Sequence, residues 1–146
     1  MSQLIRAGIR RNPETRLGQF IAPEGVGLTV DLPWPPAELN PNRKNGKHWS
    51  STHAIKTRYL ADCRLLVLQA MGQAGYAPPA GAFGLTITFT APDKRRRDMD
   101  NLLASLKSGL DGVSQALGVD DQHFEPITLR RAAGGKPGKV TIEVMA

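Results

Sequence analysis

The chain has 146 residues, and 40% of them are apolar, which suits one domain with a single hydrophobic core. Its formal net charge is +6, and the cations cluster: none lies between residues 65 and 93, whereas Lys94 to Arg97 form an unbroken block. Clustered basic charge is typical of a polyanionic partner. We expect no membrane partner, because no apolar stretch approaches the roughly 20 residues that span a bilayer. The arginine-rich N-terminus also lacks the continuous apolar run of a secretory signal.

The only cysteine is Cys63. One cysteine can form neither an intrachain disulfide nor a thiolate metal site, and this predicts a protein of the reducing cytoplasm. The apolar residues that recur around Cys63 predict a buried, unreactive thiol.

In the first third of the chain, residues 1–25 show no sustained periodicity, and we expect a poorly ordered N-terminal extension ahead of one domain at 26–146. Alternating apolar and small or polar residues predict a strand at 26–32, which the prolines of Pro33-Trp34-Pro35-Pro36 end. Residues 37–52 are polar and basic, as in a loop. Candidate DNA-backbone contacts in this loop are Arg43, Lys44, Lys47 and His48.

Apolar residues at helical spacing then predict a helix from residue 52 or 53 to about 72, and strict alternation predicts a strand at 83–90. A second helix is predicted at 99–117 from its leucine stripe. Residues 124–132 and 139–145 are typical of two strands, and the glycine-rich segment between them predicts a hairpin. The order β-α-β-α-β-β indicates an α+β domain in which two helices pack on a small mixed sheet.

The most informative segment is Arg95-Arg96-Arg97-Asp98-Met99-Asp100-Asn101, which Asp120-Asp121 follows at the far end of the second helix. Carboxylate oxygens are the ligands that Mg²⁺ prefers, and arginine binds phosphate bidentately. Neighbouring aspartates repel one another unless a cation is bound. The pattern predicts metal-dependent cleavage of nucleic acid, although each aspartate taken singly could be a helix cap or a solvated loop residue.

The geometry of the second helix limits this hypothesis. A helix of 18 residues is about 27 Å long, so the two acidic pairs can meet only if the helix starts late, kinks or unwinds, or across a dimer interface. Gly109 and Gly112 weaken its middle. Lys107 shares a polar side with Asp100 and Asp111, and it either reaches a scissile phosphate or pairs with Asp111.

From about Leu28 onward the chain resembles the RusA-type Holliday-junction resolvases, which are crossover junction endodeoxyribonucleases. The residues that carry the resemblance are Leu32-Pro33-Trp34-Pro35-Pro36, Pro92-Asp93-Lys94-Arg95-Arg96-Arg97-Asp98-Met99-Asp100-Asn101-Leu102 and Asp120-Asp121-Gln122. The resemblance implies a homodimeric, Mg²⁺-dependent endonuclease that resolves four-way DNA junctions in recombination and repair. It also implies a bacterial or phage-infected cell, since phages and prophages often encode such enzymes.

Carried over by position, the resemblance makes Asp98, Asp100 and Asp121 catalytic metal ligands, with Asp120 as a further ligand. The family's catalytic lysine falls where this chain has Ala104, and Lys107 is the candidate replacement, three residues further on. The expected DNA contacts beside this acidic set are Arg95, Arg96, Arg97 and Asn101.

Three other functions stay open at this stage. The protein could be a structure-selective nuclease on flaps, forks or RNA, or a basic DNA-binding module without catalysis. An enzyme acting on free nucleotides is disfavoured, because no glycine-rich phosphate loop is present. Trp34 or Trp49 could stack on an unpaired base, and Trp34 could equally anchor the core or a dimer.

Overall fold

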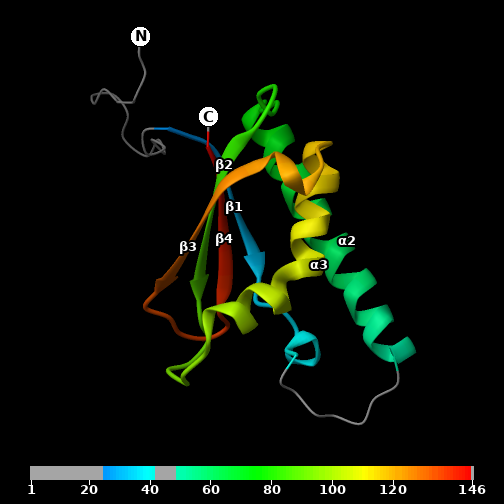
Figure 1. Cartoon of the computed structure of the whole chain (residues 1–146), viewed down its shortest axis with the longest axis vertical. Coiled ribbons are helices and arrows are strands. Elements are labelled where there is room, and N and C mark those ends of the chain that lie inside the picture. The colour runs from blue at the N-terminus through cyan, green and yellow to red at the C-terminus, as the bar shows by residue number, and fades with distance from the viewer. Residues whose placement is uncertain (1–24, 42–48, 146) are drawn as a thin grey trace.

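The computed structural model describes residues 25–41 and 49–145 (Figure 1). The expectations for residues 1–24 and for Arg43, Lys44, Lys47 and His48 lie outside the described residues. The elements in chain order are β1 (Val26–Pro33), a 3₁₀ turn η1 (Ala37–Leu39), α2 (Trp49–Ala74), β2 (Phe83–Thr90), α3 (Met99–Leu117), a 3₁₀ turn η2 (Asp121–His123), β3 (Phe124–Ala132) and β4 (Lys139–Met145). The predicted β-α-β-α-β-β order and the α+β class are confirmed.

The four strands form one mixed sheet in the order β1-β4-β2-β3. β4 pairs antiparallel with both β1 and β2, whereas β3 pairs parallel with β2. The predicted hairpin is therefore wrong, because β2 lies between β3 and β4. The physical reason is burial: β4 contributes the fully buried Val140, Ile142 and Val144, while β3 exposes nearly all its side chains and suits an edge. An edge also tolerates Pro126, which has no N–H to donate.

The glycines between β3 and β4 allow this segment to pass close to the backbone that follows β2, and they do not form a hairpin turn. A Cβ atom at Gly134 would collide with the carbonyl oxygen of Ala91, which follows β2. Gly138 has a φ of +78°, and a Cβ there would lie 2.9 Å from Cδ of Pro92. The chain therefore passes directly over the end of β2 on its way to the middle of the sheet, and side chains at these positions would block it.

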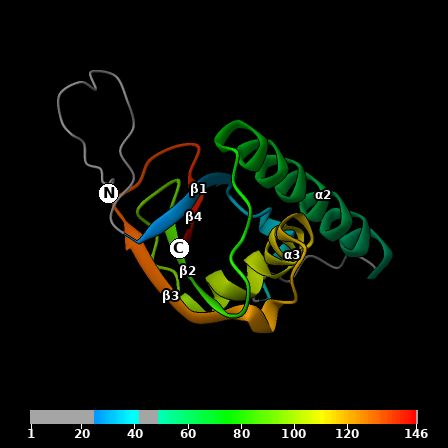
Figure 2. The same ribbon diagram turned by 90° about the horizontal axis from the view of Figure 1, so that it is seen from above.

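Both helices lie on the same side of the sheet (Figure 2). The core between the two layers is built from alternate strand residues such as Leu85 and Ile87 and from helix residues such as Leu106, Val113 and Cys63, all fully buried. No helix within the described ranges is long and apolar enough to cross a bilayer.

Two glycines of α3 set how closely the helices pack. A Cβ at Gly109 would lie 2.7 Å from Cε2 of Tyr59, and one at Gly112 would collide with the carbonyl oxygen of Leu60. α3 nevertheless runs as one helix from Met99 to Leu117. These glycines therefore have a packing role in addition to any effect on the stability of the helix, because α2 approaches closely enough to exclude a side chain.

Candidate nucleic-acid interface and acidic site

The turn between β2 and α3 is organised by Arg97. Its guanidinium is 2.9 Å from the Asp93 carboxylate, and Nη1 donates to the carbonyl of Arg95 at 3.1 Å. The same group lies 5.4 Å from the ring centroid of Trp34, and only 17% of the Arg97 side chain is exposed. Arg131 of the edge strand β3 donates to the Arg97 carbonyl at 3.1 Å. Arg97 therefore fixes the conformation of this turn through its contacts with Asp93, the Arg95 carbonyl and Trp34.

Asp93 is the residue that sequence reasoning missed. Its carboxylate also accepts from the backbone N–H of Arg95 at 2.9 Å, and the hydrogen bond from Arg97 is the main reason why the pKa of Asp93 falls to about 2. Two spacings in the sequence could have identified it, because Asp93 to Arg95 (i,i+2) is typical of an Asx turn and Asp93 to Arg97 (i,i+4) is typical of an ion pair. Interpretation of all three arginines as phosphate-binding residues left no partner for Asp93.

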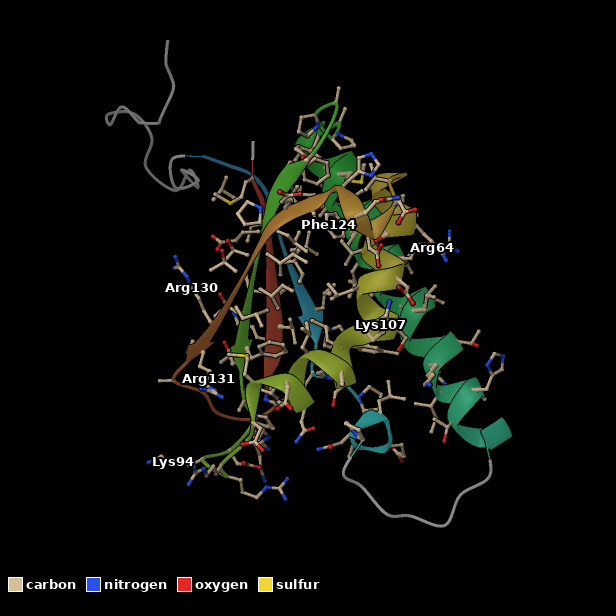
Figure 3. The ribbon with its side chains drawn as sticks, in the orientation of Figure 1. Arg64, Lys94, Lys107, Phe124, Arg130 and Arg131 are labelled. Atoms are coloured by element: carbon tan, nitrogen blue, oxygen red, sulfur yellow. The ribbon has the colours of Figure 1, made fainter. Side chains whose placement is uncertain are left out.

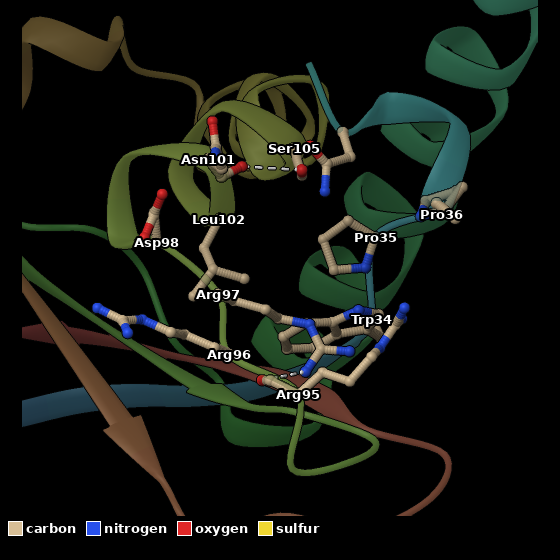
Figure 4. Close-up of a pocket in the computed structure, with 12 residues that line it drawn as sticks. Trp34, Pro35, Pro36, Arg95, Arg96, Arg97, Asp98, Asn101, Leu102 and Ser105 are labelled. Atoms are coloured by element: carbon tan, nitrogen blue, oxygen red, sulfur yellow. Dashed lines mark hydrogen bonds between the residues drawn. The ribbon is translucent and has the colours of Figure 1, made fainter. Parts of the chain in front are cut away.

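The other two arginines of the block face solvent. The Arg95 side chain is 80% exposed and makes a single long contact, 3.5 Å, with Asp93. Arg96 is also exposed, and it extends to the opposite side of the turn from Arg95 (Figure 4). Lys94 projects outward from the same turn (Figure 3). Within the described chain, these three side chains are the cations that the turn exposes to solvent.

Asp98 occupies the N-cap position of α3, yet its carboxylate makes no hydrogen bond to the amides of the first helical turn. The cap interpretation of Asp98 is therefore not supported, and the exposed Asp98 lines a hollow that Arg95 and Arg96 also line (Figure 4). Asp100, in the first turn, accepts from the backbone N–H of Asn101 at 3.0 Å. Negative charge at this end of the helix is favourable, because the N-terminus carries partial positive charge.

The hydroxyl of Ser105 donates to the carbonyl of Asn101 at 2.9 Å, one turn earlier in α3. Such bonds are typical of bent helices. Figure 1 shows that the ribbon of α3 changes direction between its first turns and its remainder. The first turns, which carry Asp98 and Asp100, are thus turned toward the end of the sheet rather than continuing the line of the helix.

Lys107 lies between two carboxylates. Its Nζ is 3.2 Å from Oδ1 of Asp111 and 3.9 Å from Oδ2 of Asp121. The predicted pairing with Asp111 is confirmed, and Asp121 joins it because the chain turns back along α3 after the left-handed Gly118. Asp120 instead accepts from Gln122, and its pKa is lowered, mainly by a hydrogen bond with the Asp121 side chain.

The acidic residues thus form two groups along α3. Asp98 and Asp100 lie at its start, and Asp111 and Asp121 lie around Lys107. Across residues 25–41 and 49–145, no three histidine, cysteine, aspartate or glutamate side chains gather closely enough to hold a metal ion. The expected convergence of Asp121 with the first pair does not occur within one described chain, even though α3 is bent.

Two hollows between α3 and η1 lie alongside the two groups of acidic residues. The first, of about 480 Å³, lies between Trp34 with its following prolines and the start of α3, and the second, of about 540 Å³, extends to Lys56, Lys107 and Asp111. Both are lined by Asn40 and Ser105, so the two hollows adjoin one another, and together they are called here the α3 groove. A further hollow of about 380 Å³ lies against β2 and β3 and shares Trp34 and the arginines with the first.

No protein-family model matches the chain. It is similar to an uncharacterized protein of Xylella fastidiosa (strain Temecula1 / ATCC 700964), with 29% identity over 116 residues. The matched region covers 80% of this chain and 74% of that protein.

Proposed function

We propose that this protein is a Mg²⁺-dependent endonuclease that resolves four-way DNA junctions, acting as a homodimer in recombination or repair in the cytoplasm of a bacterial or phage-infected cell. The proposal rests on the resemblance to RusA-type resolvases and on one structural observation. The exposed Asp98 stands at a helix N-terminus without capping the helix, and it lines the same hollow as the exposed Arg95 and Arg96. An anionic group facing solvent beside phosphate-binding cations is costly for a protein that only binds DNA, and it has a use in one that cleaves DNA.

The two carboxylates of Asp98 and Asp100 suit the way in which Mg²⁺ is coordinated in phosphate-processing sites. Magnesium keeps several waters there and takes one or two carboxylates together with substrate phosphates. Two aspartates at the start of α3 meet that requirement without Asp121, which pairs with Lys107 in the single chain. The bound ion would supply an activated water and charge stabilisation at the phosphate.

The chain's own residues would position the DNA. Arg95 and Arg96 carry exposed guanidinium groups that bind phosphate oxygens on either side of the turn. Arg97 keeps that turn rigid through Asp93 and Trp34, so the flanking arginines stay fixed relative to Asp98. Lys107 places its ammonium group about two helical turns beyond Asp100, where it can balance charge on a neighbouring phosphate.

The decisive experiment uses a synthetic four-way junction with Mg²⁺ or with EDTA, beside a flap, a fork and a linear duplex of matched sequence. We expect symmetric cleavage of the junction only with Mg²⁺. Asp98→Asn and Asp100→Asn should each lower the cleavage rate by at least about 100-fold while junction binding persists, which is the magnitude typical of losing a group that acts on the reacting phosphate.

Asp62→Asn is the matched control, because Asp62 is an exposed aspartate of α2. Its cleavage rate should equal that of the unaltered protein. Undiminished cleavage by Asp100→Asn would refute the metal-dependent mechanism. Equal cleavage of flap, fork and junction would refute the junction as the preferred substrate and leave a general branched-DNA nuclease.

A further inference from the structure

The α3 groove has the dimensions and lining of a site for one strand. Its two hollows, about 480 and 540 Å³, each fall in the range of about 300–1,000 Å³ that accommodates compact organic ligands. Asn40 and Ser105 line both, so the two hollows adjoin and a flexible ligand can extend from one into the other. A double helix needs a broad surface or an element that enters its own groove, whereas a recess between a helix and a short turn admits a chain of single residues.

Cations stand at both ends of the α3 groove. Arg95 and Arg96 line the hollow at the start of α3, and Lys56 and Lys107 line the far hollow. Glu38 and Asp111 also line the far hollow, and Asp111 pairs with Lys107 at 3.2 Å, whereas Asp98 is the one acidic residue among the described residues that line the hollow with the arginines. The arginine end is therefore the more strongly positive. A phosphate backbone is attracted to the more positive end of such a groove, and this favours the arginine end as the main anchor.

The wall of the first hollow offers flat and polar surfaces suited to nucleobases. Trp34 is half-buried and makes a T-shaped contact with Phe89, with ring centroids 6.2 Å apart, while the Arg97 guanidinium lies 5.4 Å from the centroid of its ring. Trp34 lines the hollow together with Pro35, Pro36 and Arg97, so a base would pack against an indole that is already paired with a guanidinium (Figure 4). Asn101 borders the same hollow from α3. Aromatic walls beside arginines are the combination that binds unpaired bases regardless of sequence.

We propose that the α3 groove binds an unpaired DNA strand, with its phosphates at Arg95 and Arg96 and its path leading toward Lys56. The inference deepens the proposed nuclease function, because it identifies the single-stranded part of a branched substrate as what this site recognises. Paired arms then lie outside the groove, and selectivity for branched DNA over linear duplex follows from the need for an open strand.

The test measures binding alone, by fluorescence anisotropy of dye-labelled oligothymidylate and of a blunt duplex of equal length, in EDTA so that cleavage cannot intervene. Oligothymidylate should bind at least about 10-fold more tightly than the duplex at moderate salt. Arg95→Ala/Arg96→Ala should weaken oligothymidylate binding by at least about 10-fold and reduce the salt dependence by about 0.7 per lost phosphate contact. Lys56→Ala should weaken it by a smaller factor, about 3-fold.

Arg64→Ala is the matched control, because Arg64 is an exposed arginine of α2 that projects from the far side of the helices (Figure 3). It should change oligothymidylate binding by less than about 2-fold. All the substituted side chains are exposed, and an unchanged circular dichroism spectrum and melting temperature verify the fold. Equal affinity for duplex, or equal loss in the Arg64 and Arg95/Arg96 variants, would overturn the inference.

The two proposals fail separately. Junction cleavage with Mg²⁺ by a protein that does not prefer oligothymidylate would refute the strand-binding groove and keep the nuclease. Tight, groove-dependent binding of oligothymidylate without cleavage of any branched substrate would keep the groove and refute the nuclease.

Discussion

Replacing Gly112 by alanine should separate the two helices and destabilise the fold on which the candidate site is built. A Cβ at this position would meet only backbone: it would collide with the Leu60 carbonyl oxygen, and it would lie 3.0 Å from the Arg64 nitrogen and 3.3 Å from the Leu60 carbonyl carbon. Backbone atoms inside a helix cannot rotate away as side chains do, so α2 must shift as a body.

The magnitude follows from two opposing effects. Overpacking of this kind costs about 1–3 kcal/mol, and an unyielding backbone contact belongs near the upper end. Alanine gains about 1 kcal/mol over glycine in helix propensity. The net expectation is a loss of about 1–2 kcal/mol in the free energy of unfolding, which corresponds to a fall of about 3–8 °C in melting temperature for a domain of this size.

The assay is urea and thermal unfolding followed by circular dichroism at 222 nm, with Gly72→Ala as the matched control. Gly72 lies in the last turns of α2, and a Cβ there meets nothing within 4 Å. The control should therefore be stabilised, by up to about 1 kcal/mol. Stabilisation of both variants would show that the helices are not in close contact at Gly112 and would refute the packing argument.

Three further outcomes are expected. Trp34→Ala should lower the free energy of unfolding by about 2–3 kcal/mol, and Trp34→Phe should lower it by less than half of that, because phenylalanine keeps an edge contact with Phe89. Equal losses for the two variants in urea titrations would contradict this expectation. The pKa of Asp93 is about 2 against an ordinary 3.8, so its carboxylate stabilises the fold above pH 4, and that contribution disappears as the pH falls from about 4 to 2. The difference in free energy of unfolding between the unaltered protein and Asp93→Asn should shrink over the same pH interval. A difference that stays constant would exclude the carboxylate as its source. Burial raises the pKa of Cys63 to about 12, so the folded protein should react with a thiol reagent at pH 8 no faster than it unfolds, whereas immediate labelling would show an open core.

The Asp93–Arg97–Trp34 arrangement explains why three consecutive arginines do not act alike. Arg97 is drawn inward by a carboxylate and an aromatic ring, while Arg95 and Arg96 remain outside. A polar network that is fully paired is rigid, and rigidity on one arginine fixes the two beside it. Substitution of Arg97 should therefore change the shape of the turn, whereas substitution of Arg95 or Arg96 should change the proposed DNA binding and leave that shape intact.

Local pattern was sufficient to place most elements. Strict alternation places β2 at Phe83–Thr90, and the leucine spacing together with a left-handed Gly118 places α3 at Met99–Leu117, because burial of one face imposes its own period on the sequence. α2 extends further than predicted, from Trp49 to Ala74, since Gly72 is exposed on a helix already held by its buried face. The candidate residues Asp98, Asp100 and Lys107 were likewise identified from residue type and spacing.

Which segments become neighbours was decided only in three dimensions. β3 and β4 are adjacent in the chain but not in the sheet. β4 is an inner strand, because Val140, Ile142 and Val144 are fully buried, and β3 is an edge strand. In the same way, Asp121 came to lie by Lys107 rather than by Asp98, because the return of the chain after α3 follows the packing of the whole helix pair. A period along the sequence records which face of an element is buried, whereas the partner of that face depends on a competition among distant segments that no local pattern contains.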